Sequence, residues 1–214
     1  MKLSEGLNVN IAEVKNIIFD WGGVITDLHT ERTIQAFHEL GFRQFSETVF
    51  RKEGPNLFLR FETGKVDEAG FLNELKQYLN PGVTHDQIRN AWNALLGDLP
   101  AERWILLKSL KHVFRTFLLS NTNSLHIAYY SGRLENLYGV YGYQHLFEKV
   151  YLSHLLGMRK PDREIYEYVL KDSRLEATET LFIDDNPDNI ATAQALGIQC
   201  YHLVAPETVM DLFE

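Results

Sequence analysis

Carboxylates follow two short apolar runs of this sequence. Asp20 lies in NIIFDW (Asn16–Trp21), and Asp184 and Asp185 end TLFIDD (Thr180–Asp185). Asp20 alone could equally be a turn residue. Two adjacent carboxylates at the end of a buried strand, however, repel each other unless a cation lies between them, and Mg²⁺ prefers such oxygen ligands. The acidic pair therefore predicts a site for a hard divalent cation, Mg²⁺.

A hydroxyl and an amine could complete a polar site around these carboxylates. Ser120 ends the apolar run VFRTFLLS (Val113–Ser120), and Lys160 comes just before Pro161. Each also has a purely structural interpretation. Ser120 with Asn121 could start a loop that caps a helix, and Lys160 could be a solvated side chain before a helix that begins with proline.

Strand-like and helix-like segments alternate over most of the chain. The predicted strands are Asn16–Trp21, Val113–Ser120, Val150–Ser153, Thr180–Asp185 and Ile198–Leu203, and the helices between them include Ala101–Lys111, Asp162–Lys171 and Asp188–Leu196. Such alternation predicts an α/β fold with a Rossmann-like, doubly wound parallel sheet. Ligands bind at the carboxyl ends of the strands in these sheets, which places Asp20, Ser120 and the acidic pair on one rim.

The segment 28–99 breaks this alternation. It predicts helices over Glu31–Leu40, Glu68–Leu79 and His85–Leu95, each with apolar residues at three- and four-residue spacing. An all-helical stretch directly after the first strand predicts a small helical cap inserted into the core. The expected domains are an α/β core of residues 1–27 and 100–214 and a cap of residues 28–99, with hinges near Thr26–Thr30 and Asp98–Pro100.

The composition limits the classes of partner. A net charge of −8, from 21 basic and 29 acidic residues, argues against nucleic acid and anionic membranes, because those surfaces reward clustered Lys and Arg. No apolar run reaches the roughly 20 residues that span a bilayer, and the first residues lack the apolar stretch of a signal peptide. With one cysteine, Cys200, no intrachain disulfide can form. We expect a cytoplasmic protein, and the sequence leaves monomer and homodimer open.

Four motifs resemble those of the haloacid dehalogenase-like hydrolase superfamily and fall in the same order. They are FDWGGVITD (Phe19–Asp27), LLSNTN (Leu118–Asn123), MRKP (Met158–Pro161) and FIDDNPDNIATAQALG (Phe182–Gly197). The helical insert lies where this family carries a small helical cap. The chain looks closest to bacterial sugar-phosphate phosphatases of the glucose-1-phosphate phosphatase type. The resemblance implies a Mg²⁺-dependent phosphatase that acts on a small phosphorylated metabolite, with an anomeric sugar phosphate as the first expectation.

The resemblance also implies which residues act on the metal and the phosphorus. Asp20 would be the nucleophile that attacks phosphorus and becomes an aspartyl phosphate. Mg²⁺ would be held by the Asp20 carboxylate, the backbone carbonyl of Gly22 and Asp185. Asp184 would reach the ion directly or through water.

Three further residues would contact the transferring phosphoryl group. Ser120 and the backbone amide of Asn121 would bind its oxygens, and Lys160 would neutralise Asp20 and the phosphate together. These groups would face the negative charge that spreads over the equatorial oxygens during transfer.

Gly22 departs from the family pattern. Most phosphatases of the family carry at this position a second aspartate that acts as general acid and base, and such a group is typically worth about 10²–10⁴-fold in rate. A substrate with a good leaving group, such as an anomeric phosphate, would need less protonation. Alternatively, another group, such as one from the cap, supplies the proton, or the chain is a weakly active or inactive relative that binds without hydrolysing.

Two other activities compete with the sugar phosphatase. A haloacid dehalogenase uses the same nucleophile on carbon without a metal, but the acidic pair Asp184-Asp185 argues against it. A phosphatase of nucleotides or of small acids fits the cap sequence equally well.

Two other acidic residues are candidates near the site. Glu62 in FETGKVD (Phe61–Asp67) lies between two predicted cap helices, where it could reach down and bind the substrate. Alternatively this segment is an ordinary connection, in which Gly64 ends one helix and Asp67 caps the next. Asp27, in the loop of the nucleophile, is expected to have a structural, hinge-capping role.

The remaining histidines and aromatic residues near these segments are expected to be structural. The histidines show no metal-ligand spacing on a helix. These residues are His29, His126, His154, Phe58, Phe61, Trp92 and Trp104.

Overall fold

A five-stranded parallel sheet is the centre of the computed structural model, which describes residues 3, 9–46, 57–140 and 142–213. The strands follow the order β3-β2-β1-β4-β5. They are β1 (Asn16–Phe19), β2 (Arg115–Ser120), β3 (Lys149–Leu152), β4 (Thr180–Asp184) and β5 (Gln199–His202). The predicted α/β fold class is confirmed, and each predicted strand is present with ends that differ by one or two residues.

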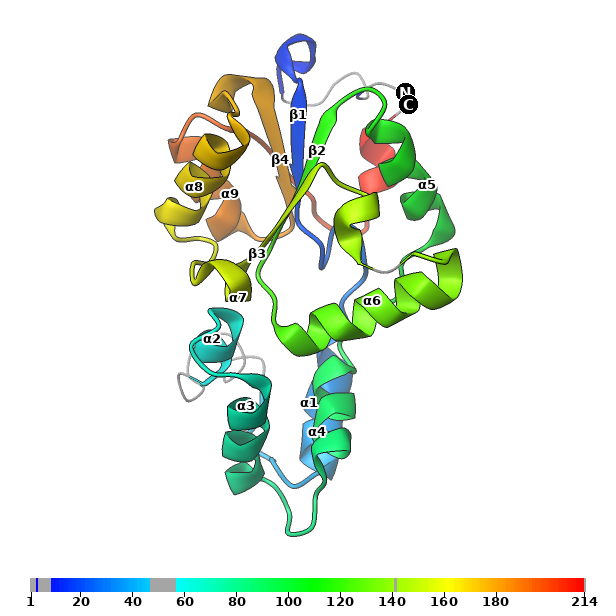
Figure 1. The fold of residues 1–214 in the computed structure, drawn as a ribbon, viewed down its shortest axis with the longest axis vertical. Helices are drawn as coiled ribbons and strands as arrows, with labels where there is room; N and C mark the ends of the chain where they lie inside the picture. Colours follow the sequence, from blue (N-terminus) through cyan, green and yellow to red (C-terminus); the bar gives the residue numbers. More distant parts are fainter. Residues whose placement is uncertain (1–2, 4–8, 47–56, 141, 214) are drawn as a thin grey trace.

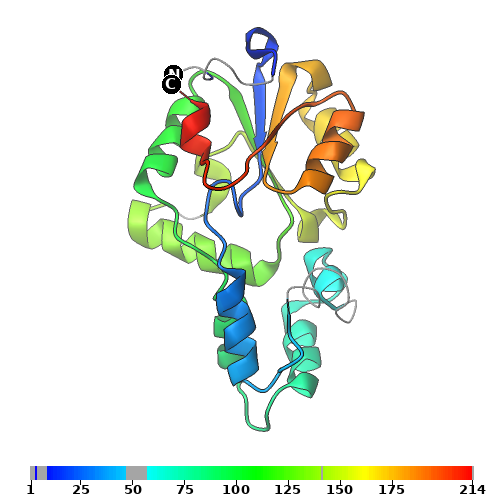
Figure 2. The ribbon, with the colours of Figure 1, turned by 180° about the vertical axis from the view of Figure 1, so that it is seen from behind.

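Helices cover both faces of this sheet (Figures 1 and 2). On one face lie α5 (Ala101–Leu110) and α6 (Ser124–Tyr138), and on the other lie α8 (Arg163–Ser173) and α9 (Pro187–Ala195), while α7 (Ser153–Leu156) directly follows β3. Successive strand residues point to opposite faces. Ile17 and Phe19 of β1 therefore join the core under α5 and α6, and Ile18 joins the core under α8 and α9.

The segment after β1 forms a separate helical body beyond the carboxyl end of the sheet (Figure 1). Its α-helices within the described residues are α1 (Thr30–Glu39), α2 (Leu57–Glu62), α3 (Glu68–Leu75) and α4 (His85–Asn93). The helix predicted to run to Leu79 ends at Leu75 and continues as a 3₁₀ turn over Lys76–Tyr78.

The helical body has its own hydrophobic core. The fully buried members of this core include Phe37, Phe45, Phe71 and Trp92, and Leu125 of α6 packs against them. A core of its own is what an inserted unit needs to fold as a cap. We propose residues 28–99 as that cap.

Two chain segments connect the cap to the sheet and pair with each other. Leu28 bridges Leu96 in antiparallel fashion, and the amide of Gly97 donates to the carbonyl of Asp27 at 2.9 Å. A Cβ on Gly97 would lie 2.5 Å from that carbonyl oxygen, so only glycine permits this approach. The two connections are therefore held side by side at the cap–core junction.

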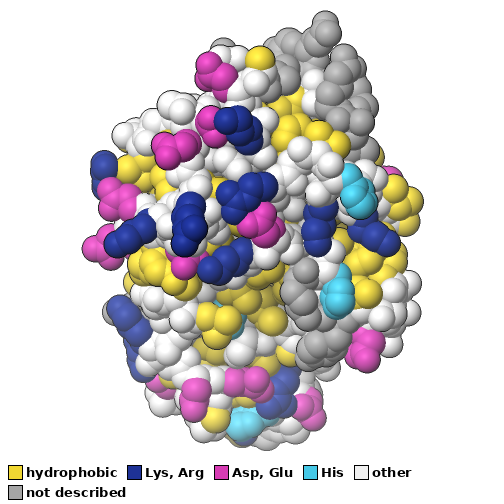
Figure 3. All heavy atoms as spheres, turned by 45° about the horizontal axis from the view of Figure 1, so that its top comes forward, with side chains coloured by type: hydrophobic (Ala, Val, Ile, Leu, Met, Phe, Trp, Pro, Cys, Tyr) yellow, Lys and Arg dark blue, Asp and Glu magenta, His cyan; other side chains and the backbone are white. Residues whose placement is uncertain are grey.

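Side chains of both charge signs are mixed on the surface. Figure 3 shows one face on which basic and acidic side chains lie next to each other. Exposed ion pairs include Lys15–Glu179, Arg115–Glu148 and Lys149–Asp172. Within the ranges that the structure describes, no helix is long and apolar enough to cross a bilayer.

Candidate active site

Three carboxylates meet at the carboxyl end of the sheet. Asp20 follows β1, Asp184 ends β4 and Asp185 follows it, as the strand-end rule predicts. Oxygen atoms of the three side chains lie within 4.8 Å of one another. Among the described residues, this is the one group of three or more acidic, histidine or cysteine side chains with a spacing that could hold a metal ion.

Lys160 lies between two of these carboxylates. Its Nζ is 2.9 Å from Asp20 Oδ1 and 2.7 Å from Asp184 Oδ2, and its side chain is 1% exposed. Burial alone would lower the pKa of the Lys160 amine, but the two carboxylates outweigh it and the pKa is raised. The interpretation of Lys160 as a solvated side chain is therefore wrong, and the residue is a buried cation.

Asn121 positions the backbone of Lys160. The Asn121 amide group donates to the Lys160 carbonyl at 2.8 Å, and the Lys160 amide donates to Asn121 Oδ1 at 2.9 Å. This pair of hydrogen bonds connects the loop after β2 to the loop before α8, which begins at Arg163 rather than at Pro161. The side chain of Asn121 is thus occupied, which leaves its backbone amide as the predicted phosphoryl contact.

Asp184 has no exposed surface and accepts several hydrogen bonds. Its Oδ1 accepts from the amide of Asn186 at 2.8 Å and from Asn189 at 2.9 Å, and its Oδ2 accepts from Lys160 and, at 3.1 Å, from Asn189. A carboxylate offers about four such positions. Asp184 therefore anchors Lys160. To bind a metal directly, Asp184 would have to give up one of these hydrogen bonds. Its predicted metal role stays a prediction.

The negative charge of the cluster is incompletely compensated. Burial raises the pKa of Asp20 to about 7, Lys160 opposes this rise, and Asp184 and Asp185 add to it. Three carboxylates around one ammonium group suit an added divalent cation, which favours the ionised form of Asp20. The donor set thus fits Mg²⁺, and the assignment of Asp20, Asp185 and the carbonyl of Gly22 as its ligands stays a prediction.

Gly23 explains how the carboxylate of Asp185 fits against the loop of Asp20. Gly23 has a φ of +76°, and a Cβ there would lie 2.4 Å from Asp185 Oδ2. A side chain at this position would therefore collide with the acidic cluster as well as strain the backbone.

Ser120 lies at the end of β2, which neighbours β1, the strand that Asp20 follows. It is 6% exposed. The loop that follows is fixed by Ser153, whose Oγ accepts from the amide of Thr122 at 2.9 Å and donates to its carbonyl at 3.0 Å. Ser120 thus has a defined place on the rim, and its phosphoryl-binding role remains a prediction.

Glu62 connects the cap to the core. It is the last residue of α2 rather than part of a connection between helices, and its carboxylate lies 3.3 Å from Arg159. Burial raises the pKa of Glu62, and Arg159 opposes the rise. The expected turn is also present, since Gly64 is left-handed and Asp67 caps α3. Nothing in the sequence singled out Arg159 as the partner of Glu62.

A second cap–core contact involves Trp92 of α4. Its Nε1 donates to Asn123 Oδ1 at 3.2 Å, and its ring stacks on His126 with centroids 5.3 Å apart. Burial lowers the pKa of His126 to about 3, so this ring is neutral. Packing was the expected role of Trp92 and is confirmed, whereas its hydrogen bond to Asn123 was not predicted.

Asp27 has a structural contact, as expected, where the two connections of the cap pair. Its Oδ1 accepts from the Arg103 guanidinium at 2.9 Å, and the same nitrogen donates to the carbonyl of Ile25 at 3.2 Å. The residue that precedes α1 is His29. Asp27 therefore connects the loop that follows Asp20 to α5.

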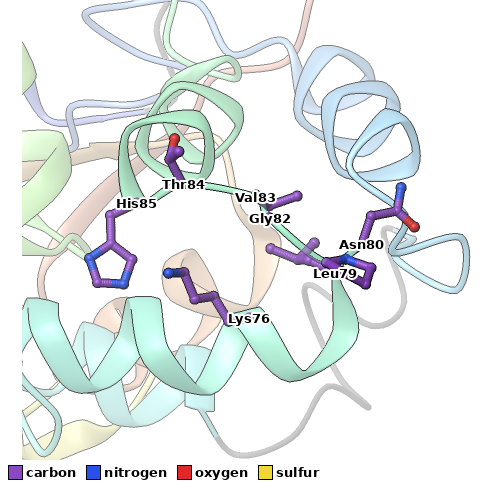
Figure 4. A pocket seen from close by; sticks show the side chains of 8 residues that line it. Lys76, Leu79, Asn80, Gly82, Val83, Thr84 and His85 are labelled. Carbon is purple, nitrogen blue, oxygen red and sulfur yellow. The ribbon is translucent and has the colours of Figure 1, made fainter.

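Two surface pockets differ in their relation to this site. A pocket of about 620 Å³ lies where the chain passes from α3 to α4, at the end of the cap that is farthest from the sheet (Figure 1), and Figure 4 shows its lining side chains. It is lined by Lys76, Leu79, Asn80, Pro81, Gly82, Val83, Thr84 and His85. A pocket of about 480 Å³ borders the acidic cluster instead, because Gly23, Leu28 and Asp185 are among its lining residues.

Comparison with known proteins places the chain in a family. The model of the haloacid dehalogenase-like hydrolases matches residues 14–197. A D-ribitol-5-phosphate phosphatase of Bacteroides thetaiotaomicron is 29% identical over 205 residues, which cover 92% of this chain and 94% of that protein. A sesquiterpene phosphatase of Aspergillus oryzae is 30% identical over 203 residues, with the same coverage of 92% and 94%.

Solved structures agree with this placement. A haloacid dehalogenase family enzyme of Bacteroides thetaiotaomicron, crystallised with magnesium and inorganic phosphate, has a TM-score of 0.84 and 34% identity, and the match covers 91% of this chain and 96% of that chain. An L-2-haloacid dehalogenase has a TM-score of 0.57 at 19% identity, which shows a shared fold only. The resemblance seen in the four motifs is confirmed, and the chain belongs to the haloacid dehalogenase-like hydrolase family.

Proposed function

We propose that this hydrolase is a Mg²⁺-dependent phosphatase that cleaves a small sugar phosphate through an aspartyl-phosphate intermediate. The observation that carries the proposal is the buried Lys160 between Asp20 and Asp184, with Asp185 beside them. Lys160 keeps the nucleophile oriented and offers a positive charge to an incoming phosphate. A bound Mg²⁺ would neutralise the phosphoryl oxygens and complete this charge balance.

The residues of the site support two successive displacements. A carboxylate oxygen of Asp20 forms a bond to phosphorus, the ester P–O bond breaks, and its electron pair leaves with the alcohol oxygen. Water then attacks the aspartyl phosphate, releases inorganic phosphate and restores Asp20. Ser120, the amide of Asn121 and Lys160 would hold the phosphoryl oxygens in both steps.

The comparisons support the choice of substrate class. The name of one relative gives a phosphorylated sugar alcohol as its substrate, and a related enzyme was crystallised with magnesium and inorganic phosphate. Another relative is named for a sesquiterpene substrate. A polar substrate fits the charged pair of Glu62 and Arg159 at the cap–core junction better than a hydrocarbon does.

A substrate panel tests the proposal directly. We expect phosphate release from glucose 1-phosphate or ribitol 5-phosphate to exceed release from farnesyl phosphate, and to disappear when a chelator removes Mg²⁺. Released phosphate is measured with and without Mg²⁺, and 4-nitrophenyl phosphate serves as a substrate that needs no sugar contacts. A folded protein that binds Mg²⁺ but releases phosphate from no member of the panel would be a binding protein instead.

Glu62 is proposed to contact the hydroxyl groups of the substrate from the cap. Replacing Glu62 by glutamine is expected to raise KM for the preferred sugar phosphate about tenfold, since hydrogen bonds to charged groups contribute about 1.5–3 kcal/mol. The KM for 4-nitrophenyl phosphate should not change, because this substrate carries no hydroxyl group.

A matched control is available within the cap. Glu74 pairs with Arg60 at 3.1 Å on the surface of the cap, and Glu74→Gln should leave both KM values unchanged. Equal KM effects in the two variants, or no rise in Glu62→Gln, would remove Glu62 from the substrate site.

A further inference from the structure

An ion pair joins the cap to the core beyond the carboxyl end of the sheet. Glu62, the last residue of α2, accepts from Nη2 of Arg159 at 3.3 Å. Arg159 is the residue before Lys160, and its carbonyl accepts from the amide of Asp162 at 2.9 Å. Because Asn121 also binds the backbone of Lys160, the segment that carries Arg159 is fixed on both sides.

The turn after Glu62 is seated on α7, which lies next to α2 (Figure 1). Gly64 has a φ of +66°, and a Cβ there would collide with the backbone oxygen of His154 in α7. At the start of this turn, the hydroxyl of Thr63 donates to the carbonyl of Leu59 at 2.7 Å. The cap and the core therefore meet at a defined backbone contact, which positions the carboxylate of Glu62.

The ion pair leaves hydrogen-bonding capacity unused. Within the ranges that the structure describes, the contact with Glu62 is the one hydrogen bond of the Arg159 guanidinium, and its buried Nε has no partner. The carboxylate of Glu62 likewise accepts from Arg159 alone among these residues, although a carboxylate can accept several hydrogen bonds. The side chains of Arg159 and Glu62 are 32% and 20% exposed, so a ligand can reach both.

The pair lies on the side of the site to which the carbon chain of a substrate extends. Asp20 is at the carboxyl end of the sheet, so in an in-line displacement the ester oxygen departs toward the cap (Figure 1). Lys160 Nζ is 2.9 Å from Asp20 Oδ1, and Arg159 precedes Lys160 in the chain. Because Glu62 faces Arg159 from the cap, the two charges mark where the cap meets this side of the site.

A carboxylate beside a guanidinium matches a hydroxyl group better than it matches an anion. A hydroxyl can donate to Glu62 and accept from Arg159, so neighbouring hydroxyl groups on a carbon chain satisfy both side chains. A carboxylate on the substrate can pair with Arg159 only, and the charge of Glu62 repels it. The pair therefore combines an attractive and a repulsive element, which is how sites distinguish similar ligands.

We propose that Glu62 and Arg159 form a subsite for neutral polyol chains, which admits phosphorylated sugars and sugar alcohols and rejects phosphorylated acids. The inference rests on the proposed phosphatase function and deepens it, because it says how the same site selects its substrate. The cap sequence left a phosphatase of small acids open, and the charge of Glu62 argues against that activity. Arg159 is the specificity-determining residue on the core side of the subsite.

Matched esters that differ by one charge test the proposal. Ribitol 5-phosphate and ribonate 5-phosphate share a carbon chain and end in an alcohol and a carboxylate, and glycerol 3-phosphate and 3-phosphoglycerate form a shorter pair. Their kcat/KM values are measured in saturating Mg²⁺ at pH 8, which favours ionised Glu62, since burial raises the pKa of this residue. The wild type should cleave each polyol ester at least about tenfold better than its acid partner, as expected for one charge near a protein surface.

The two charged residues should shift this preference in opposite directions. Glu62→Gln removes the repulsion, so the ratio of polyol to acid kcat/KM should fall about tenfold. Arg159→Gln removes the partner of an acid, so the ratio should rise, while kcat/KM for the polyol ester falls about tenfold with the lost hydrogen bond. Arg159→Lys keeps the charge and should keep the ratio close to that of the wild type.

A control variant and a control substrate accompany these measurements. Arg60 of α2 pairs with Glu74 at 3.1 Å on the surface of the cap, and Arg60→Gln should leave the ratio unchanged. Thermal unfolding checks that each variant folds. The ester 4-nitrophenyl phosphate, which carries neither a hydroxyl group nor a second anionic group, reports whether a variant still completes the displacement.

Two results would overturn the proposal. One is a wild type that cleaves the acid member of each pair as well as the polyol member, or better. The other is an equal change in kcat/KM for polyol and acid esters in Glu62→Gln, which would mean that the ion pair only holds the cap on the core. Failure of the proposed function is distinct, because it would appear as no Mg²⁺-dependent release even from 4-nitrophenyl phosphate.

Discussion

Replacing Asp20 by asparagine is expected to lower Mg²⁺-dependent phosphate release at least about 10³-fold, because the amide cannot form the bond to phosphorus on which both displacements depend. The variant should still fold. Released phosphate is measured with the best substrate of the panel, at several enzyme concentrations, to exclude a trace of contaminating activity.

The stability of this variant gives a second measurement that does not depend on activity. The folded-state pKa of Asp20, about 7, lies above its ordinary value of 3.8. Ionisation of Asp20 therefore lowers the free energy of unfolding of the metal-free protein. This loss of stability grows as the pH rises from about 4 to 7. At pH 8 in chelator, Asp20→Asn should unfold at a temperature equal to or above that of the wild type.

With Mg²⁺ present, the wild type should instead unfold at a higher temperature than Asp20→Asn. Binding to the folded state raises the unfolding temperature of the wild type, and the variant, which lacks one carboxylate ligand, should gain less. Asp188→Asn is the control, since Asp188 is exposed in the first turn of α9 and lies outside the acidic cluster. Undiminished phosphate release by Asp20→Asn would contradict the assignment of the nucleophile.

The strands and the rim were predictable because local sequence decides them. Runs such as NIIF and TLFID are short, largely apolar, rich in β-branched and aromatic residues and bounded by turn residues, which favours a strand buried on both faces over a helix. Because the strands are parallel, Asp20, Ser120 and Asp184 must all lie at the carboxyl end of the sheet. The sequence therefore located these side chains without any knowledge of the family.

Helix α6 is not among the helices predicted from the sequence, and the reason lies in its own residues. Its sequence, SLHIAYYSGRLENLY, carries Ser131 and Gly132 at its centre and several aromatic residues, which are weak helix formers. Its ends carried clear signals, since Asn123 caps the first turn and Gly139 ends the helix with a φ of +66°. Packing against the sheet stabilises this helix more than its own propensity does.

The environment of Lys160 could not be derived from its neighbours in sequence. Met158–Pro161 predicts an exposed connection as readily as a buried cation, and only the approach of β1 and β4 surrounds the amine with Asp20 and Asp184. The close approach of Leu28 to Gly22, where an added Cβ would lie 2.8 Å from Leu28 Cδ1, depends in the same way on the path of the cap connection. Long-range packing, which no local pattern encodes, decides both.

Replacing Lys160 by methionine is expected to lower the free energy of unfolding in chelator by about 3–5 kcal/mol at pH 8, as is typical when one partner of a buried ion pair is removed. The side chain has nearly the same length, so the loss reflects charge. The substitution leaves Asp20 and Asp184 without the buried cation that pairs with both. Denaturant unfolding measures the change, and phosphate release should fall by about 10²–10³-fold as well.

The stability loss should depend on pH in a defined direction. Without Lys160, the folded-state pKa of Asp20 rises further above 3.8, because the amine no longer opposes the effect of burial. A carboxyl group whose pKa is raised by folding stabilises the folded state at low pH and loses that contribution as the pH rises. The difference in the free energy of unfolding between the wild type and Lys160→Met should therefore be largest above pH 7 and should shrink toward pH 5.

Mg²⁺ distinguishes the electrostatic explanation from a simple packing defect. If the cation binds among these carboxylates, it restores part of the missing positive charge and narrows the stability gap between Lys160→Met and the wild type. Lys15→Met is the control, since Lys15 forms an exposed pair with Glu179 and such pairs contribute about 0–1 kcal/mol. A gap that is the same with and without Mg²⁺, or no larger than in the control, would show that Lys160 does not hold the charge of the cluster together.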